Sequence, residues 1–147
     1  MKNKIAEIKI AYTSPIDKDI IKITTSEKAF DVLLQLWDQN ILELQEEFKL
    51  LLLNRSNNVL GIYNMSKGGV SGTIVDLKII FATALKCVAS SIVLAHNHPS
   101  GNISPSSHDI ELTKKIKEAG ELLDIKVLDH IIVTKNGYYS FADHGML

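Results

Sequence analysis

The sequence predicts an α/β protein in which a mixed central β-sheet is flanked by helices. Apolar runs of strand length alternate along the chain with longer segments whose apolar residues recur at helical spacing. The uninterrupted run Ser91-Ile92-Val93-Leu94-Ala95 is typical of a buried strand. The length of 147 residues and the 46% hydrophobic content fit one domain with one core.

The N-terminal part of the chain is expected to contribute two strands and a helix. Apolar and charged residues alternate over residues 5–12, which indicates a half-exposed strand, and residues 19–24 are expected to pair with it. Apolar residues then recur at helical spacing over 29–37, in a helix that ends near Asn40. We interpret Trp37 as a core anchor of this helix rather than as a platform for a ligand.

A hairpin and a helix are expected next. Residues 46–53 and 58–64 have strand character and are joined by a short polar turn. Further on, Thr73 and Asp76 fit a capping box that would begin a helix through about Val88.

The last part of the chain predicts a strand–helix–strand unit. The apolar run at 91–95 is followed by a helix over about 106–122 and a strand over 125–133. A short hairpin around Asn136-Gly137 closes the domain.

Two histidines after the apolar run at 91–95 give the strongest indication of function. Residues two apart on a strand point to the same side, so the imidazoles of His96 and His98 can converge on one point. Pro99 and Gly101 then turn the chain into a loop, and Asp109 lies in the first turn of the next helix. Two imidazoles and a carboxylate suit a zinc ion with a fourth position left for water, which is the layout of a catalytic site.

Helix capping offers a second interpretation of part of this motif. Ser106 and Asp109 fit a capping box in which Asp replaces the usual Glu. Capping and metal ligation do not exclude each other, because a carboxylate has two oxygens. The combination of His-x-His, a Pro-Gly turn and a first-turn Asp favours a metal site.

These residues resemble a known family. The pattern His96-x-His98, seven residues, Ser106, two residues and Asp109 resembles the JAMM (JAB1/MPN/Mov34) metalloprotease motif. The finer pattern, HNHPSG followed by PS-x-x-D and later by Asp129-His130-Ile131-Ile132-Val133, resembles the RadC family of bacterial JAMM-like proteins.

The resemblance implies one structural domain in a cytidine-deaminase-like arrangement. Residues 46–147 would form the RadC-type JAMM/MPN domain, and residues 1–45 a strand-helix extension that packs on it. RadC proteins commonly carry an N-terminal helical region with helix-hairpin-helix character, which residues 1–45 are expected to lack.

The resemblance also implies a role for each site residue. His96, His98 and Asp109 would bind zinc, Glu46 would act as general base on the attacking water, and Ser106 would stabilise the developing oxyanion.

The choice of Glu46 over its neighbour also has support from the strand pattern. Alternation along the predicted strand places Glu46 on one face with Phe48, and Glu47 on the other face with Lys49. The Glu-x-Phe pattern of the family selects Glu46 as well. We therefore expect Glu47 to lie on the wetter face and to have no catalytic role.

Asp129 and His130 are possible partners behind the metal ligands. The pair resembles the Asp-His of RadC proteins, but no standard JAMM role attaches to it. A contact that orients a metal ligand and a plain buried, hydrogen-bonded His130 stay equally open at this point.

Composition limits the partners and the location of the protein. The net charge is −1, Arg55 is the single arginine, and no basic patch is evident, so the charges argue against direct DNA binding. No apolar run approaches the ~20 residues of a membrane helix, and the charged N-terminus does not resemble a signal peptide, so we expect a cytoplasmic protein.

The lone Cys87 excludes an internal disulfide and is expected to be a small core residue.

Two classes of function fit these observations. The first is a zinc-dependent hydrolase of peptide or isopeptide bonds that acts on a peptide or protein substrate. The alternative is a non-catalytic metal-binding or interaction module of the RadC family, which is associated with DNA repair. A zinc nucleobase deaminase is excluded, because its signature needs His-x-Glu and Pro-Cys-x-x-Cys, whereas this chain has His-x-His and one cysteine.

Overall fold

A five-stranded mixed sheet forms the centre of the computed structural model, which describes residues 4–13, 19–69 and 74–147. The elements in chain order are α1 (Ser26–Leu36), β1 (Glu47–Leu53), β2 (Val59–Lys67), α2 (Leu77–Lys86), β3 (Ser91–Asn97), α3 (Ser107–Leu122), β4 (Lys126–Thr134) and β5 (Gly137–Ser140). The strand order is β2-β1-β3-β4-β5, in which β3 and β4 are parallel and the other neighbours are antiparallel. The predicted mixed α/β fold is confirmed.

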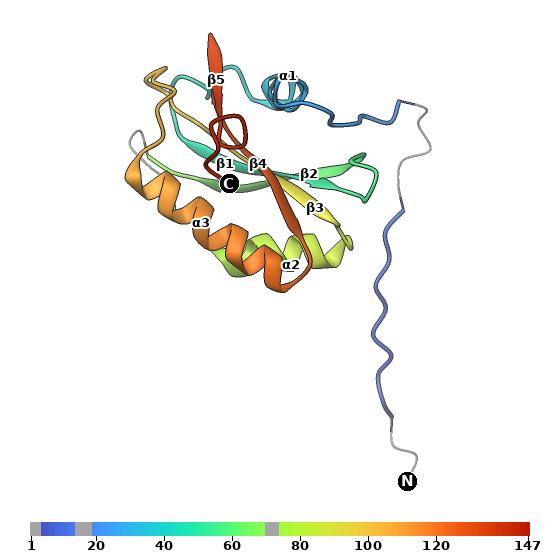
Figure 1. The fold of residues 1–147 in the computed structure, drawn as a ribbon. Helices are drawn as coiled ribbons and strands as arrows, with labels where there is room; N and C mark the ends of the chain where they lie inside the picture. The colour runs from blue at the N-terminus through green and yellow to red at the C-terminus, as the bar shows by residue number, and fades with distance from the viewer. Residues whose placement is uncertain (1–3, 14–18, 70–73) are drawn as a thin grey trace.

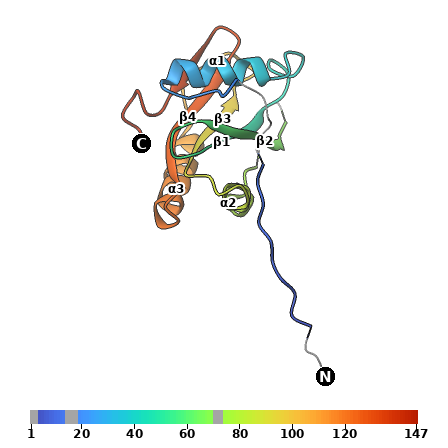
Figure 2. The ribbon, with the colours of Figure 1, turned by 90° about the vertical axis from the view of Figure 1, so that its right-hand side faces the viewer.

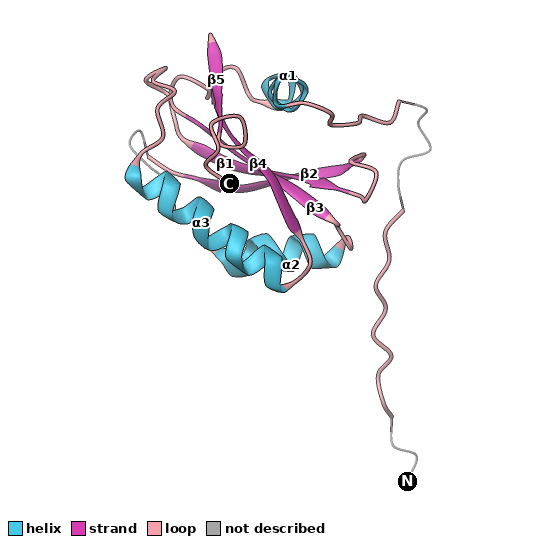
Figure 3. Cartoon of the chain, viewed as in Figure 1, coloured by secondary structure: helices cyan, strands magenta, loops and turns pink. Residues whose placement is uncertain are grey.

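Helices cover both faces of the sheet. Figure 1 and Figure 3 show α1 on one face and α2 and α3 on the other, and the turned view in Figure 2 shows the same layers. Helix α3 connects the parallel strands β3 and β4, as a parallel pair requires a crossover.

This arrangement explains the uninterrupted apolar run in β3. Every residue of β1 and of β3 is buried, because successive side chains point to opposite faces and both faces are covered. On the α1 face the strands contribute Leu51 and Val93 to a cluster that includes Trp37, which is 2% exposed and anchors the core as predicted. On the other face Leu50 and Leu94 belong to a cluster that includes residues of α2 and α3.

Several predicted elements are found close to their expected bounds. The hairpin of β1 and β2 is confirmed, as is the helix that follows the histidines, for which Ser106 is the N-cap. The predicted start of α2 is corrected, because its N-cap is Asp76, which was expected inside the helix, and Thr73 lies outside the described residues. Cys87 is the C-cap of α2, where it packs against the core but stays partly exposed.

The predicted N-terminal strand is wrong. Residues 5–12 form no strand and are exposed. The Tyr12 hydroxyl donates a hydrogen bond to the Leu60 carbonyl of β2, at 2.7 Å. A strand needs a neighbour to receive its backbone hydrogen bonds, and residues 19–24 do not provide one. Instead, Ile21 accepts the N–H of Val59, so this segment lies beside the start of β2.

No helix in the described part of the chain has both the length and the apolar character needed to cross a membrane.

Candidate metal centre

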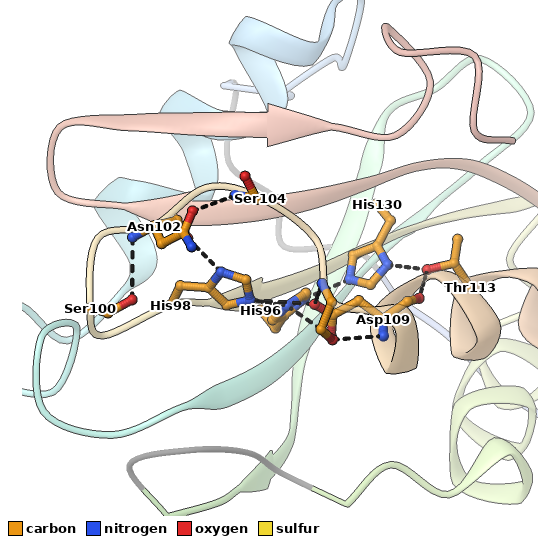
Figure 4. Close-up of polar contacts among 9 residues, drawn as sticks. His96, His98, Ser100, Asn102, Ser104, Asp109, Thr113 and His130 are labelled. Carbon is orange, nitrogen blue, oxygen red and sulfur yellow. Dashed lines mark hydrogen bonds and ion pairs between the residues drawn. The ribbon is translucent and has the colours of Figure 1, made fainter.

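Two histidines and an aspartate converge where β3 ends and α3 begins. His96 is the second-last residue of β3, His98 follows the strand, and Asp109 lies in the first turn of α3. The Nε2 atoms of His96 and His98 are 3.0 Å apart. Asp109 Oδ1 lies 3.4 Å from the first nitrogen and Oδ2 lies 3.4 Å from the second (Figure 4). These three side chains could therefore hold a metal ion.

A chain of hydrogen bonds fixes the proton on the His96 ring. The Thr113 hydroxyl donates to the carbonyl of Asp109 at 2.6 Å, so its oxygen must accept from Nδ1 of His130, also at 2.6 Å. Nε2 of a neutral His130 then accepts from Nδ1 of His96 at 2.7 Å. His96 is left with a lone pair on Nε2, the atom that faces His98 and Asp109 (Figure 4).

The loop after β3 fixes the proton on the His98 ring in the same way. A carbonyl can only accept, so Nδ1 of His98 donates to the carbonyl of Asn102, at 2.5 Å. The loop holds this carbonyl in place through its own contacts: Gly101 adopts a φ of 82°, and the Ser100 hydroxyl accepts the N–H of Asn102 at 3.3 Å. A neutral His98 therefore also directs a lone pair from Nε2 toward His96 and Asp109.

Two lone pairs and a carboxylate that face one another require a positive charge. Two imidazole nitrogens and a carboxylate oxygen are ligand types that a transition-metal ion such as zinc would accept. The pKa values agree with this requirement. Burial lowers the pKa of His98, but its contacts with Asp109 and Asn102 outweigh burial and raise it. Burial opposes ionisation of Asp109, but in the metal-free chain its interactions with the imidazoles of His96 and His98 hold its pKa well below the usual range.

Asp109 also belongs to a capping box, so both interpretations of this residue have a physical basis. Its Oδ2 accepts the N–H of Ser106 at 2.8 Å, and the Ser106 hydroxyl accepts the N–H of Asp109 at 3.1 Å. The capping box fixes the carboxylate at the helix N-terminus, where the helix dipole favours a negative charge.

Glu46 lies at the entrance to β1, next to this centre. Its side chain interacts electrostatically with His96, His98 and Asp109. Burial raises the pKa of Glu46, the two histidines lower it, and Asp109 raises it, with a net shift upward. A carboxylate with a raised pKa beside the candidate metal ligands is suited to accept and release a proton.

The expectation that Glu47 lies on a wetter face is wrong. Glu47 is 4% exposed and pairs with the buried Lys49 at 3.6 Å and with Lys67 at 3.7 Å. Alternation assigned the face correctly, since Phe48 packs with the α2 and α3 cluster. The degree of burial was misjudged because α1 covers the face that bears Glu47.

His130 and Asp129 have different surroundings. His130 is completely buried, stacks on Phe141 with ring centroids 4.7 Å apart and hydrogen-bonds to His96. Burial lowers its pKa, which keeps the ring neutral. The carboxylate of Asp129 instead accepts from the Ser140 hydroxyl at 2.6 Å and from the N–H of Ala142 at 3.0 Å, contacts that hold the chain beyond β5.

Sequence reasoning missed Thr113. Its hydroxyl contacts both the Asp109 carbonyl and the ring of His130, and it is 1% exposed. The signal was the spacing of four residues from Asp109, which places both on one side of a helix.

The fold and the site together define a mixed α/β domain with a His-His-Asp centre at the end of its parallel strand pair. A family model described as RadC-like JAB domain matches residues 23–146, and the chain belongs to this family. The match begins upstream of residue 46, where the motif resemblance was expected to start.

The most similar relatives include proteins of several bacteria, each named UPF0758 protein. The chain is 49% identical to that of Flavobacterium johnsoniae over 126 residues, which is 85% of this chain and 53% of the relative. It is 47% identical to that of Porphyromonas gingivalis over 104 residues, 70% of this chain and 46% of the relative. The chain thus spans about half the length of the curated relatives it matches.

Proposed function

We propose that this chain is a zinc-dependent hydrolase of amide bonds in peptide or isopeptide linkages. The observation that carries the proposal is the convergence of two histidine lone pairs and a carboxylate on one point, with the electrostatically coupled Glu46 beside them. Membership of the RadC-like JAB domain family supports it, because the motif resembles that of JAMM metalloproteases.

Glu46 acts as the general base. A bound zinc ion supplies Lewis-acid chemistry that activates water near neutral pH and polarises a carbonyl. Glu46 accepts a proton from the attacking water and delivers it to the leaving amine. Its raised pKa favours both steps, because the proton is held strongly enough to be carried and weakly enough to be released.

Ser106 stabilises the charge that develops on the scissile carbonyl. Its oxygen accepts the N–H of Asp109, which leaves the hydroxyl proton available to a substrate. Ser106 is exposed, whereas Asp109 beside it is buried, so a substrate can approach this hydroxyl. A donor aimed at a developing oxyanion contributes to catalysis in this class of reaction.

Elemental analysis followed by an activity screen tests the proposal. We expect about one zinc ion per chain in protein never exposed to chelator, and a lower content in a chelated control. A panel of short peptides and isopeptide-linked conjugates should include a cleaved substrate, with activity lost on chelation and restored by zinc. Absence of metal at neutral pH would overturn the proposal, and metal without turnover on any amide would favour a non-catalytic module.

A DNA-binding measurement tests the association with DNA repair. With a net charge of −1 the chain offers few phosphate contacts, so binding to duplex DNA should be weak and should vanish near physiological salt. A submicromolar Kd at ~150 mM salt would revive a direct role on DNA.

A further inference from the structure

Asn97, the residue between the two histidines, contacts the segment that carries Glu46. It is completely buried, and its side chain makes three hydrogen bonds to the backbone before and at the start of β1. Nδ2 donates to the carbonyls of Leu42 at 2.7 Å and Gln45 at 2.9 Å. Oδ1 accepts the N–H of Glu47 at 2.7 Å.

The chemistry of this position fits an asparagine side chain. Two carbonyls and one N–H face it, and a primary amide offers two donors and an acceptor on one short side chain. A carboxylate of the same shape would place acceptors against the carbonyls of Leu42 and Gln45. A hydroxyl could satisfy at most part of the set.

These contacts hold the peptide groups on both sides of Glu46. The carbonyl of Gln45 belongs to the peptide group before Glu46, and the N–H of Glu47 belongs to the one after it. The remaining groups of the same two peptides are also bonded: Glu46 donates to the carbonyl of Gly69 at 3.3 Å and accepts from the N–H of Gly68 at 2.8 Å. The Cα–Cβ direction of Glu46 is fixed as a result.

We propose that Asn97 is a positioning residue that sets the Glu46 carboxylate at a fixed place relative to the metal ligands. Asn97 lies between His96 and His98 in the sequence, so its side chain connects the strand that carries the candidate metal ligands to the segment that carries Glu46. The inference rests on the proposed function of Glu46 as general base. Small displacements of a catalytic group reduce turnover by as much as about 10²-fold.

The test compares Asn97→Ala with the parent in three measurements. We expect zinc content equal to that of the parent, a kcat lower by about 10- to 100-fold with KM nearly unchanged, and faster hydrogen exchange at the amides of Glu46 and Glu47. In a Glu46→Gln background, Asn97→Ala should cause no further loss of kcat, because the residue acts through Glu46. If Asn97→Ala does not fold, Asn97→Ser takes its place in all three measurements.

Asn54→Ala is the matched control, because Asn54 holds backbone at the opposite end of β1. Its Oδ1 accepts the N–H groups of Ser56 at 2.9 Å and Asn58 at 3.0 Å. This variant should leave kcat and the exchange of Glu46 and Glu47 unchanged.

Several outcomes would overturn the assignment of Asn97. These are parent-like exchange at Glu46 and Glu47, a kcat loss that adds to that of Glu46→Gln, or a loss of zinc, which would mean that Asn97 acts on the histidines instead. If the parent cleaves no substrate, the proposed function fails, and hydrogen exchange alone decides whether Asn97 holds the Glu46 segment.

Discussion

The two faces of the sheet carry buried polar groups at the same end, but the groups are paired in different ways. On the α1 face, the charges of Glu47 and Lys49 neutralise each other, and Lys49 also donates to Asn64 at 2.7 Å and lies 4.8 Å from the ring centre of Trp37. On the α3 face, His96 and His98 direct lone pairs at each other beside a carboxylate.

This difference separates a structural cluster from a binding site. A buried ion pair is weak evidence of function, because its charges are already compensated. On the α3 face, the ion-pair partners of Asp109 among the described residues are the imidazoles of His96 and His98, which are themselves candidate metal ligands. Several acceptor atoms that face one point are therefore better evidence for a binding site than a buried charge that already has a partner.

The largest expected effect is the loss of metal from the α3 face. His96→Ala or His98→Ala should reduce the zinc content from about one ion per chain to near zero, because the two remaining ligands bind zinc too weakly to retain it during dialysis. Elemental analysis after dialysis measures the effect. Lys49→Met, on the opposite face, is the control and should keep its zinc. Equal zinc content in all three variants would place the metal elsewhere.

The next largest effects are expected from substitution of the two neighbouring glutamates. Substitution of Glu46 should change the rate of hydrolysis, and substitution of Glu47 should change the free energy of unfolding. Glu46→Gln should keep zinc and lower hydrolysis by about 10²–10⁴-fold, because an amide cannot accept the proton of water. Glu47→Gln should leave kcat within a few-fold but lower the free energy of unfolding, by as much as about 3–5 kcal/mol, because it leaves Lys49 without its buried partner. Steady-state kinetics and urea titration measure the two quantities.

An exchange of these two outcomes would mean that the strand register assigned here is wrong by one residue. If both variants matched the parent on a cleaved substrate, the general-base mechanism would be wrong.

Local patterns in the sequence were sufficient to predict much of the fold and the convergence of His96, His98 and Asp109. The capped start of α3 and the strand before His96 depend on short-range signals, namely a capping box and an apolar run. Residues 5–12 show the limit of such signals, because alternation describes a strand only where a partner strand exists.

Contacts between residues far apart in the chain could not be predicted from the sequence. Glu47 is buried beside Lys67 of β2 and Asn97 of β3, and the bond between His96 and His130 joins residues of two adjacent strands. The role of Asn97 likewise depends on contacts with residues about fifty positions away. None of these contacts leaves a periodic signal in a single sequence.

A smaller effect is expected from the hydrogen-bonded residues behind the ligands. His130→Phe keeps the aromatic packing against Phe141 but removes the acceptor that fixes the His96 ring. Zinc affinity should fall by about 10–100-fold, as is typical when a partner of a ligating histidine is lost. Competition with a chromophoric chelator measures the zinc affinity.

Thr113→Val should also lower the zinc affinity, since His130 then loses the acceptor of its own proton. An unchanged affinity in both variants would show that the proton arrangement of His96 does not depend on this chain.

The smallest expected effect is a pH dependence confined to the α3 face. His98 must be neutral to bind a metal, and its contact with Asp109 raises its pKa in the metal-free chain despite burial. Asp109 has a lowered pKa and stays ionised, while His130 has a lowered pKa and stays neutral, whereas the raised pKa of His98 makes its proton a competitor of the metal. Zinc affinity should therefore begin to fall at a pH above the usual histidine value of about 6.5, by about tenfold per pH unit below the raised pKa. Chelator competition between about pH 5.5 and 8.5 measures how the zinc affinity depends on pH.

His144→Gln, which removes an exposed histidine outside the centre, is the control and should not change this pH dependence. A zinc affinity that stays constant down to about pH 6 would contradict the raised pKa of His98 and would mean that Asp109 does not hold a proton on that ring.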